Sequence, residues 1–507
     1  MLCVTIARTK HKSAIAEHLQ VAEQGAKLVE LRLDYIGRSI DLARLLKNRP
    51  TPIIVTCRRK ADGGRWDRTE EERLMLLRSA ISMGIEYVDL EEDIAAKIPR
   101  YGKTKRIISL HDFDGMPKNL DAVHAGLAKH DADIVKIAVQ GNSFKDTIRM
   151  LQLMQTAAVP TIGISMGDYG IPTRILATRY GAPFTYCVYD TERAVAPGQL
   201  SFDQMKNVYR ADSIDAETKI FGVAGDPIAQ SYSPLVHNAS FLANKLNYRY
   251  IPFRIPAEEL ELFLSWCKEE KIGGLSVTIP HKQTILHLLD QAESGAQGIG
   301  ACNTVVFASL DKEVIGYNTD FRGAMDCLSE AMTNWTGKKD PFENETVLIL
   351  GAGGVARAIG YGLSQRRAEV TITSRSKEKA ESLSKHINGN WIDWGDRHLF
   401  EAKILINCTP VGMFPDMDAS PFIMSTLKGN TLVFDTVYNP EQTLFLKGAK
   451  LAGCPVVSGL QMFARQAAYQ YRLFTGLEPP IDVMVKTLKK AISPVNYKEA
   501  EEEGDDD

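Results

Sequence analysis

Few features of a secreted, membrane-bound or metal-binding protein are present in this chain. Its 8 cysteines are scattered singly and form no CxxC pair, so neither a disulfide framework nor a metal site is expected. No apolar stretch approaches the roughly 18 to 20 residues that span a bilayer. The first residues, MLCVTIARTK, do not have the charged-then-apolar order of a signal peptide. We therefore expect a cytoplasmic protein.

Charge of one sign is not in excess either. The 60 basic and 63 acidic residues nearly cancel, and no long basic run occurs, which argues against nucleic acid or an anionic membrane as partner and favours small molecules. The acidic run EAEEEGDDD ends the chain, and we expect residues 496–507 to be a disordered tail. A length of 507 residues exceeds what one core usually serves, so we expect several domains.

The first 200 residues alternate short β-rich runs with segments of helical periodicity. Eight such units predict a (β/α)₈ TIM barrel over residues 1–212, with function at the C-terminal ends of the strands. The eight expected strands start at Leu2, Leu28, Pro52, Tyr87, Arg106, Asp133, Thr161 and Phe184.

The second half begins after a polar linker at 213–218, where the new apolar strand IFGVAG follows. Strands and helices alternate again, and another fresh strand, TVLIL, follows a polar stretch that ends near Glu345. We expect an α/β substrate domain at 219–330 and a Rossmann-type nucleotide-binding domain at 331–458. The C-terminal helices, at 459–495, are expected to pack back on the substrate domain.

A glycine-rich turn follows the strand TVLIL. In GAGGVARAIG, Gly351, Gly353 and Gly354 stand between that strand and a helix, where backbone N–H groups and the helix dipole can hold a pyrophosphate. Ala356 occupies the third glycine position of the fingerprint, which tolerates it. Alone the motif is a weak signal, but its place between strand and helix indicates a dinucleotide site.

The end of the next strand distinguishes NADP from NAD. Ser374, 23 residues after Gly351, is followed by Arg375 and Ser376, where an NAD enzyme would place Asp or Glu for the ribose 2′-hydroxyl. A guanidinium suits a 2′-phosphate, and Lys379 adds a cation. Arg375 alone could be a solvated strand end; together with the turn it predicts NADP.

A lysine lies in the middle of an apolar barrel strand. Lys136 in DIVKIAV would be costly to bury unless it is used, and burial favours the neutral amine that a Schiff base requires. A lysine reaching solvent from the strand end is the alternative. His111 ends the preceding strand and is a candidate acid or base, although alone it would more often be structural. Glu91, one strand earlier, is expected to orient that imidazole.

The strings DIVKIAV, RIISLHDF, VELRLD, TCRRKADGG, GIPTR and APGQ resemble type I 3-dehydroquinate dehydratase over about residues 1–204. The resemblance implies imine formation between Lys136 and a ketone, proton abstraction by His111, and loss of a hydroxyl with His111 as the acid. Val195 stands where the family often has Ser, so one hydrogen bond to substrate is expected to be missing. The implied substrate-binding residues are Thr5, Glu30, Arg32, Arg58, Arg174 and Gln199.

The strings SYSPLVHN, LSVTIPHK, GYNTD and GLQMFARQA resemble the shikimate dehydrogenase family up to about Gly476. The resemblance implies that Lys282 and Asp320 form the catalytic pair. Singly, Lys282 would more often be a surface lysine and Asp320 a helix N-cap. Ser276 departs from a common Asn. The family's cofactor positions include Thr409 and Gly459, and its substrate positions are Ser231, Ser233, Thr278, Asn303, Tyr438 and Gln466.

The two resemblances describe consecutive steps: 3-dehydroquinate loses water to give 3-dehydroshikimate, which NADPH reduces to shikimate. The whole chain therefore resembles the bifunctional dehydratase and dehydrogenase family, with these small molecules as partners. Three alternatives stay open. A quinate dehydrogenase shares the second half's residues, a class I aldolase would explain Lys136 but not the run of arginines, and a non-catalytic metabolite sensor would not need Lys136, His111, Lys282 and Asp320.

Overall fold

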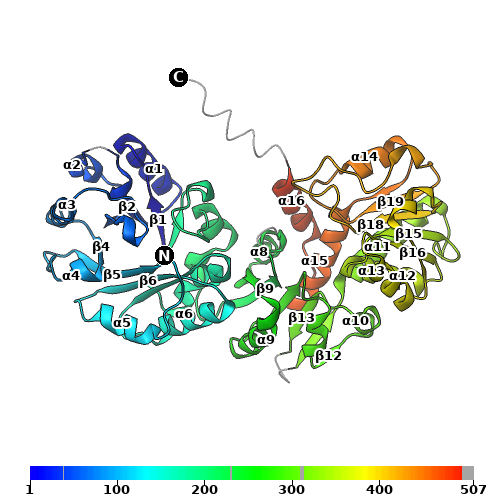
Figure 1. Ribbon diagram of the computed structural model, residues 1–507, viewed down its shortest axis with the longest axis horizontal. Helices are drawn as coiled ribbons and strands as arrows, with labels where there is room; N and C mark the ends of the chain where they lie inside the picture. Colours follow the sequence, from blue (N-terminus) through cyan, green and yellow to red (C-terminus); the bar gives the residue numbers. More distant parts are fainter. Residues whose placement is uncertain (38, 229–230, 309–312, 494–507) are drawn as a thin grey trace. The chain divides into compact units, whose positions relative to one another are not determined.

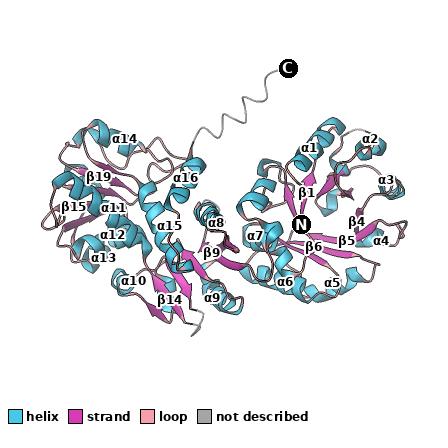
Figure 2. Cartoon of the chain, turned by 180° about the vertical axis from the view of Figure 1, so that it is seen from behind, coloured by secondary structure: helices cyan, strands magenta, loops and turns pink. Residues whose placement is uncertain are grey.

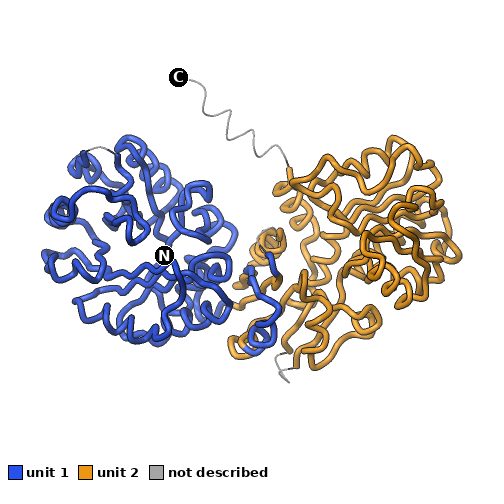
Figure 3. Tube along the Cα trace, in the orientation of Figure 1, with its two compact units in different colours: residues 1–218, 226–229, 251–265 blue, residues 219–225, 230–250, 266–507 orange. Residues whose placement is uncertain are grey.

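The computed structural model describes residues 1–37, 39–228, 231–308 and 313–493. The predicted tail at 496–507 lies outside these residues. The contacts divide the chain into two compact units, shown in Figure 3. The first comprises residues 1–218 with 226–229 and 251–265, and the second comprises the rest. No helix in the described ranges is both long and apolar enough to cross a bilayer.

The first unit contains the predicted eight-stranded parallel barrel (Figure 1). The strands form one ladder in the order β7-β6-β5-β4-β3-β2-β1-β8, and the helices lie outside them (Figure 2). The strands are β1 (Leu2–Ile6), β2 (Leu28–Arg32), β3 (Ile53–Thr56), β4 (Tyr87–Glu91), β5 (Lys105–Asp112), β6 (Ile134–Gln140), β7 (Thr161–Met166) and β8 (Thr185–Val188). The helices are α1 (His11–Glu23), α2 (Leu42–Leu46), α3 (Glu70–Ser82), α4 (Glu92–Ala95), α5 (Leu120–Ala128), α6 (Phe144–Thr156) and α7 (Ile171–Ile175).

The barrel interior changes from apolar to polar along β2, β3, β5 and β6. Leu28, Ile54, Ile107 and Ile134 pack together in one buried cluster. Because side chains alternate between the two faces of a strand, the next inward positions on these strands follow two residues later. They are Glu30, Thr56, Ser109 and Lys136, all buried. The sequence pattern thus builds an apolar floor and a polar layer above it.

The second half of the chain begins with a mixed sheet in the order β10-β9-β11-β13-β14-β12. β9 and β11 are parallel, whereas β13 is antiparallel to both β11 and β14. The strands are β9 (Lys219–Gly225), β10 (Tyr248–Arg254), β11 (Gly274–Val277), β12 (Gln291–Ala292), β13 (Thr304–Phe307) and β14 (Val314–Tyr317). The helices are α8 (Ser233–Ala243), α9 (Leu260–Glu269), α10 (Ser294–Ile299) and α11 (Thr319–Thr336).

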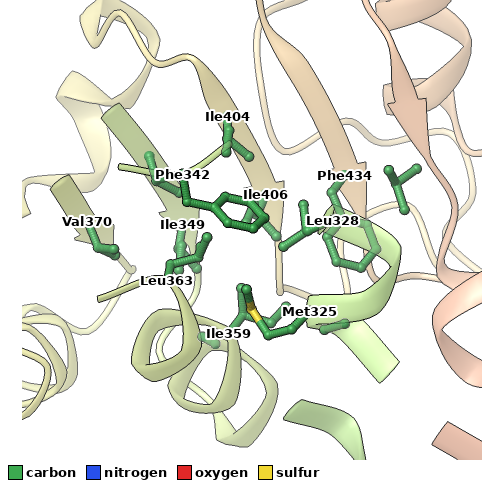
Figure 4. Close-up of a cluster of buried hydrophobic side chains, with 14 of the residues drawn as sticks. Met325, Leu328, Phe342, Ile349, Ile359, Leu363, Val370, Ile404, Ile406 and Phe434 are labelled. Carbon is green, nitrogen blue, oxygen red and sulfur yellow. The ribbon is translucent and has the colours of Figure 1, made fainter. Parts of the chain in front are cut away.

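A second, parallel sheet follows in the order β17-β16-β15-β18-β19-β20, as expected for a Rossmann-type domain. Its strands are β15 (Thr346–Leu350), β16 (Glu369–Thr373), β17 (Asn390–Ile392), β18 (Ile404–Asn407), β19 (Leu432–Asp435) and β20 (Val456–Val457). Its helices are α12 (Gly354–Ser364), α13 (Lys377–His386) and α14 (Leu444–Leu451). Ile349, Ile406 and Phe434 of the sheet pack with Ile359 of α12 and Leu328 of α11 in the core shown in Figure 4.

Two C-terminal helices, α15 (Gly459–Thr475) and α16 (Ile481–Ile492), complete the second unit. Both contact α8, and α15 also packs along α11. The Phe474 ring on α15 lies 5.2 Å from that of Phe221 on β9. The chain therefore returns from the parallel sheet to cover the mixed sheet.

Candidate active sites

The barrel holds a cavity of about 50 Å³ at the C-terminal ends of its strands. Except for Glu91, every residue that the sequence predicted for this site lines the cavity. Apolar side chains, among them Ile164, Met166, Val195 and Ala196, form part of the wall. The predicted residues that line it are Thr5, Glu30, Arg32, Arg58, His111, Lys136, Arg174 and Gln199.

Lys136 lies among carboxylates. Its Nζ donates to Asp89 Oδ2 at 3.0 Å and lies 3.8 Å from Glu30 Oε1. Glu30 also accepts hydrogen bonds from Thr5 and Thr56, both at 2.8 Å. These contacts offset the cost of burying the ammonium group, and they place its nitrogen beside the cavity.

Asp89 is a central residue of this site that sequence reasoning missed. Besides Lys136, it accepts from Arg58 Nη2 at 2.7 Å and from Ser109 Oγ at 2.6 Å. Burial alone would raise the pKa of Asp89, but the charges of Arg58 and Lys136 hold it well below its usual range. Asp89 stands two residues before Glu91 in YVDLE, so strand alternation could have placed it on the inner face.

Glu91 does not orient His111 as expected. Its carboxylate accepts from Arg58 Nη1 at 2.9 Å and from Arg73 Nη1 at 2.7 Å, because two guanidinium groups offer it charge-assisted hydrogen bonds. Arg73, on α3, is fully buried and was not predicted. Glu91 instead helps to hold Arg58 in the cavity wall.

His111 is half-buried, and its buried Nδ1 has no hydrogen-bond partner among the described residues. Burial and the nearby charges of Arg58 and Lys136 hold the pKa of His111 well below its usual value. The imidazole is therefore neutral near pH 7 and can accept a proton from a substrate.

Three arginines line the cavity, and two of them are already paired. Arg32 donates to Asp34, and Arg58 donates to Asp89 and Glu91. Arg174 on α7 donates through Nη2 to the carbonyl of Pro197 at 3.2 Å, while its buried Nε has no partner within the described ranges. Burial lowers the pKa of Arg174 to about 10. Of the three, Arg174 is the best placed to bind an incoming carboxylate.

The second unit contains a separate cavity of about 290 Å³ in which Lys282 and Asp320 meet. Lys282 Nζ donates to Asp320 Oδ2 at 2.5 Å. Asp320 does not cap α11: the side chain of Asn318 does so by accepting from Phe321 N. The Asp320 carboxylate is therefore available to hold the lysine.

All six predicted substrate positions line this cavity, and α15 adds a further residue. Gln470, one helical turn after Gln466, accepts from Ser276 Oγ at 2.9 Å and donates to Thr304 Oγ1 at 3.1 Å. The Tyr250 hydroxyl donates to Ser276 Oγ at 2.5 Å. Ser276, which stands where the family commonly has Asn, therefore links Tyr250 to Gln470 by hydrogen bonds. The six are Ser231, Ser233, Thr278, Asn303, Tyr438 and Gln466.

The glycine turn borders the same cavity. Gly351 has φ +112°, and a Cβ there would lie 2.9 Å from the Cys408 carbonyl oxygen, so only glycine fits. Gly353 caps α12 and lines the cavity together with Gly354. A Cβ on Gly354 would lie 3.2 Å from Lys282 Cδ. The glycine turn and the Lys282–Asp320 pair thus belong to one site.

The remaining predicted cofactor residues lie at strand ends and helix starts of the parallel sheet. Ala356 is fully buried within α12, and Gly459, at the start of α15, lines the cavity. Thr409 donates to Asn407 Oδ1 at 2.7 Å just after β18. The side chain of Ser376 caps α13 by accepting from Lys379 N.

Arg375 follows β16, with Ser374 before it. Its side chain is exposed, and no carboxylate pairs with it within the described ranges. An exposed, unpaired guanidinium at this strand end is consistent with a 2′-phosphate site.

Family models match four segments that are spread over both halves of the chain. Residues 2–216 match type I 3-dehydroquinase, residues 223–305 the shikimate dehydrogenase substrate binding domain, and residues 459–489 the shikimate 5′-dehydrogenase C-terminal domain. Residues 346–437 match the coenzyme F420-dependent NADP oxidoreductase model.

One curated relative spans both halves. The chloroplastic bifunctional 3-dehydroquinate dehydratase/shikimate dehydrogenase of Arabidopsis thaliana is 33% identical over 510 residues, which cover 97% of this chain and 84% of the relative. The chain belongs to this bifunctional family. The shikimate dehydrogenase (NADP(+)) of Methanococcus maripaludis is 37% identical over 54% of this chain and 98% of its own length.

Two solved structures resemble the dehydrogenase half. A shikimate dehydrogenase in complex with NADP+ has a TM-score of 0.51 and 36% identity, covering 55% of this chain and 98% of its own. A quinate dehydrogenase from Corynebacterium glutamicum in complex with NAD has a TM-score of 0.50 and 30% identity, covering 54% and 99%. The fold thus serves both substrates, and the choice between them depends on the side chains of the site.

Proposed function

We propose that this chain catalyses two consecutive reactions, the dehydration of 3-dehydroquinate to 3-dehydroshikimate and the NADPH-dependent reduction of 3-dehydroshikimate to shikimate. Membership of the bifunctional family supports both steps. The observation that carries the proposal is a pair of cavities. One holds a buried lysine and an arginine that has no ion-pair partner among the described residues; the other holds a lysine–aspartate pair beside a glycine turn.

In the barrel, Lys136 attacks the substrate ketone after losing a proton, and the resulting imine acidifies the adjacent carbon. His111, neutral at pH 7, takes the proton from that carbon and returns it to the departing hydroxyl, which leaves as water. Arg174 holds the substrate carboxylate and so fixes which carbon faces His111. Hydrolysis of the imine then restores Lys136.

The dehydrogenase residues fit a dinucleotide, because Gly351 leaves room where a side chain would collide with Cys408. NADPH, when bound, supplies the hydride for the ketone carbon. Lys282 donates the proton that the ketone oxygen requires, and Asp320 holds the lysine in place. Ser231, Ser233 and Asn303 offer polar groups for the carboxylate and hydroxyls of the substrate.

Shikimate is favoured over quinate because Ser231, Ser233 and Thr278 all line the cavity. The comparison with the quinate enzyme makes quinate the second candidate. Turnover of shikimate and of quinate, each with NADP+ and with NAD+, decides between them. Faster oxidation of quinate with NAD+ would overturn both the substrate and the cofactor assignment.

The dehydratase assignment is tested by trapping the imine. Borohydride reduction in the presence of 3-dehydroshikimate should fix the adduct on Lys136, as peptide mass spectrometry would show. An adduct on another lysine would refute the assigned nucleophile. An adduct that forms with aldolase substrates but not with 3-dehydroshikimate would favour the aldolase alternative.

We further propose a cytoplasmic location. All 8 cysteines are free, as is usual in a reducing compartment. The Arabidopsis relative is chloroplastic, so fractionation of the source cells, with this chain detected by antibody, is the direct test. Recovery of the chain in an organelle would contradict the proposal.

A further inference from the structure

Tyr186 has a buried hydroxyl that the described structure leaves unused. Tyr186 lies on β8, lines the barrel cavity and is 3% exposed. Its hydroxyl is buried and has no hydrogen-bond partner in the part of the chain that the structure describes. Ile164 and Met166 belong to the same apolar cluster as its ring. A phenylalanine would fill this space without the cost of an unsatisfied polar group.

The tyrosine lies against the nucleophile. Lys136 Nζ is 4.2 Å from the centroid of the Tyr186 ring. A ketone that reacts at Lys136 therefore comes close to this side chain as well. Tyr186 thus borders the position where charge develops during the attack.

The carboxylates that contact the amine cannot donate to the ketone oxygen. Asp89 and Glu30 are carboxylates and only accept hydrogen bonds. Arg58 is already used by Asp89, Glu91 and Ser109. The Tyr186 hydroxyl lies on a side chain beside the lysine, and among the described residues it donates to no other group.

The hydroxyl keeps its proton at the pH of the reaction. Burial raises the pKa of Tyr186 well above its usual value, and the nearby Glu30 raises it further. The side chain is therefore a neutral phenol that can donate a hydrogen bond but not a proton carrier near pH 7.

We propose that Tyr186 binds the oxygen of the ketone that Lys136 attacks, an inference that rests on the proposed dehydratase function. As the C–N bond forms, the carbonyl electron pair moves to this oxygen, which takes up the proton lost by the nitrogen. The carbinolamine then loses the oxygen as water and becomes the imine. Tyr186 keeps its own proton and stabilises the oxygen throughout by a hydrogen bond.

Tyr186→Phe tests the proposal because it removes only the hydroxyl. In single-turnover borohydride trapping with 3-dehydroshikimate, imine formation should slow by about 10- to 100-fold, while the melting temperature stays equal or rises. In steady state with 3-dehydroquinate, kcat should fall more than KM rises. Tyr209→Phe is the matched control, because Tyr209 is buried in the same unit but does not line the cavity.

The outcomes separate the two claims. A wild-type rate of imine formation in Tyr186→Phe would overturn this inference and leave the dehydratase assignment standing. An equal loss in Tyr209→Phe would show that any buried hydroxyl in the unit matters, and would also overturn it. If the wild-type protein forms no adduct, the proposed function itself fails, and the role of Tyr186 fails with it.

Discussion

Replacing Arg174 with methionine should weaken substrate binding and at the same time stabilise the barrel. The fall in the pKa of Arg174 from its ordinary 12.5 to about 10 corresponds to roughly 3 kcal/mol of cost for holding the charge in the fold. At pH 7 the guanidinium is protonated in both the folded and the unfolded chain, so the whole cost is present. It would decline only as the pH rises above about 10.

Methionine has similar bulk and no charge, so Arg174→Met should recover part of that cost. A gain of about 1 to 3 kcal/mol would raise the barrel's melting transition by roughly 2 to 10 °C. The KM for 3-dehydroquinate should rise about 100-fold, because a bidentate contact to the substrate carboxylate is lost. Calorimetry and steady-state kinetics on the full chain measure the two effects.

Arg73→Met is the control, because Arg73 is equally buried but paired with Glu70 and Glu91. Its loss leaves the Glu91 carboxylate with one partner fewer and should cost about 3 kcal/mol. The two substitutions should therefore move the melting temperature in opposite directions. If Arg174→Met destabilises the barrel as Arg73→Met does, or leaves KM unchanged, the proposal that Arg174 binds the substrate carboxylate without a carboxylate partner of its own is refuted.

Three further predictions concern the two sites. Lys136→Ala should abolish dehydration and leave NADPH-dependent reduction of 3-dehydroshikimate intact, whereas Lys282→Ala should abolish the reduction and leave dehydration intact. Separate assays of the two reactions check these results, and loss of both activities in a folded variant would contradict them. Arg375→Ser should lower kcat/KM for NADP+ by about 10- to 100-fold and leave kcat/KM for NAD+ nearly unchanged. An equal loss with both cofactors would contradict a contact between Arg375 and the 2′-phosphate. The pKa of His111 is held well below 6.5, so kcat/KM for dehydration should show no loss from histidine protonation between pH 8 and 6. The free energy of unfolding should fall as the pH drops below about 6.5, because the unfolded chain then takes up a proton that the folded chain does not. A titration of kcat/KM centred near pH 6.5 would show that the pKa of His111 is not lowered in the folded protein.

Residues whose roles follow from strand or helix periodicity were predictable from the sequence. Lys136 and His111 stood out because a parallel barrel strand has few polar positions, and each lies on the inner face that the two-residue alternation assigns. Asp89 could have been found by the same rule, since it shares a face with Glu91. Gln470 lies one helical turn after Gln466 and could have been found from helical spacing.

Features that depend on tertiary contacts could not be predicted. The pairing of Glu91 with Arg73 depends on where α3 lies relative to β4. Among the described residues the Tyr186 hydroxyl has no hydrogen-bond partner, which depends on how side chains from other strands are placed around it. The grouping of residues 251–265 with the barrel unit arises from contacts such as the Phe144 and Phe253 rings, 6.1 Å apart, which no local pattern encodes.

The central claim is that one chain performs two consecutive reactions. Purified wild-type protein supplied with 3-dehydroquinate and NADPH alone should oxidise NADPH, with a lag while 3-dehydroshikimate accumulates, and should yield shikimate by mass spectrometry. Lys136→Ala should oxidise NADPH only when 3-dehydroshikimate is added. No NADPH oxidation by the wild-type protein with 3-dehydroquinate, or the same oxidation by Lys136→Ala, would contradict the account.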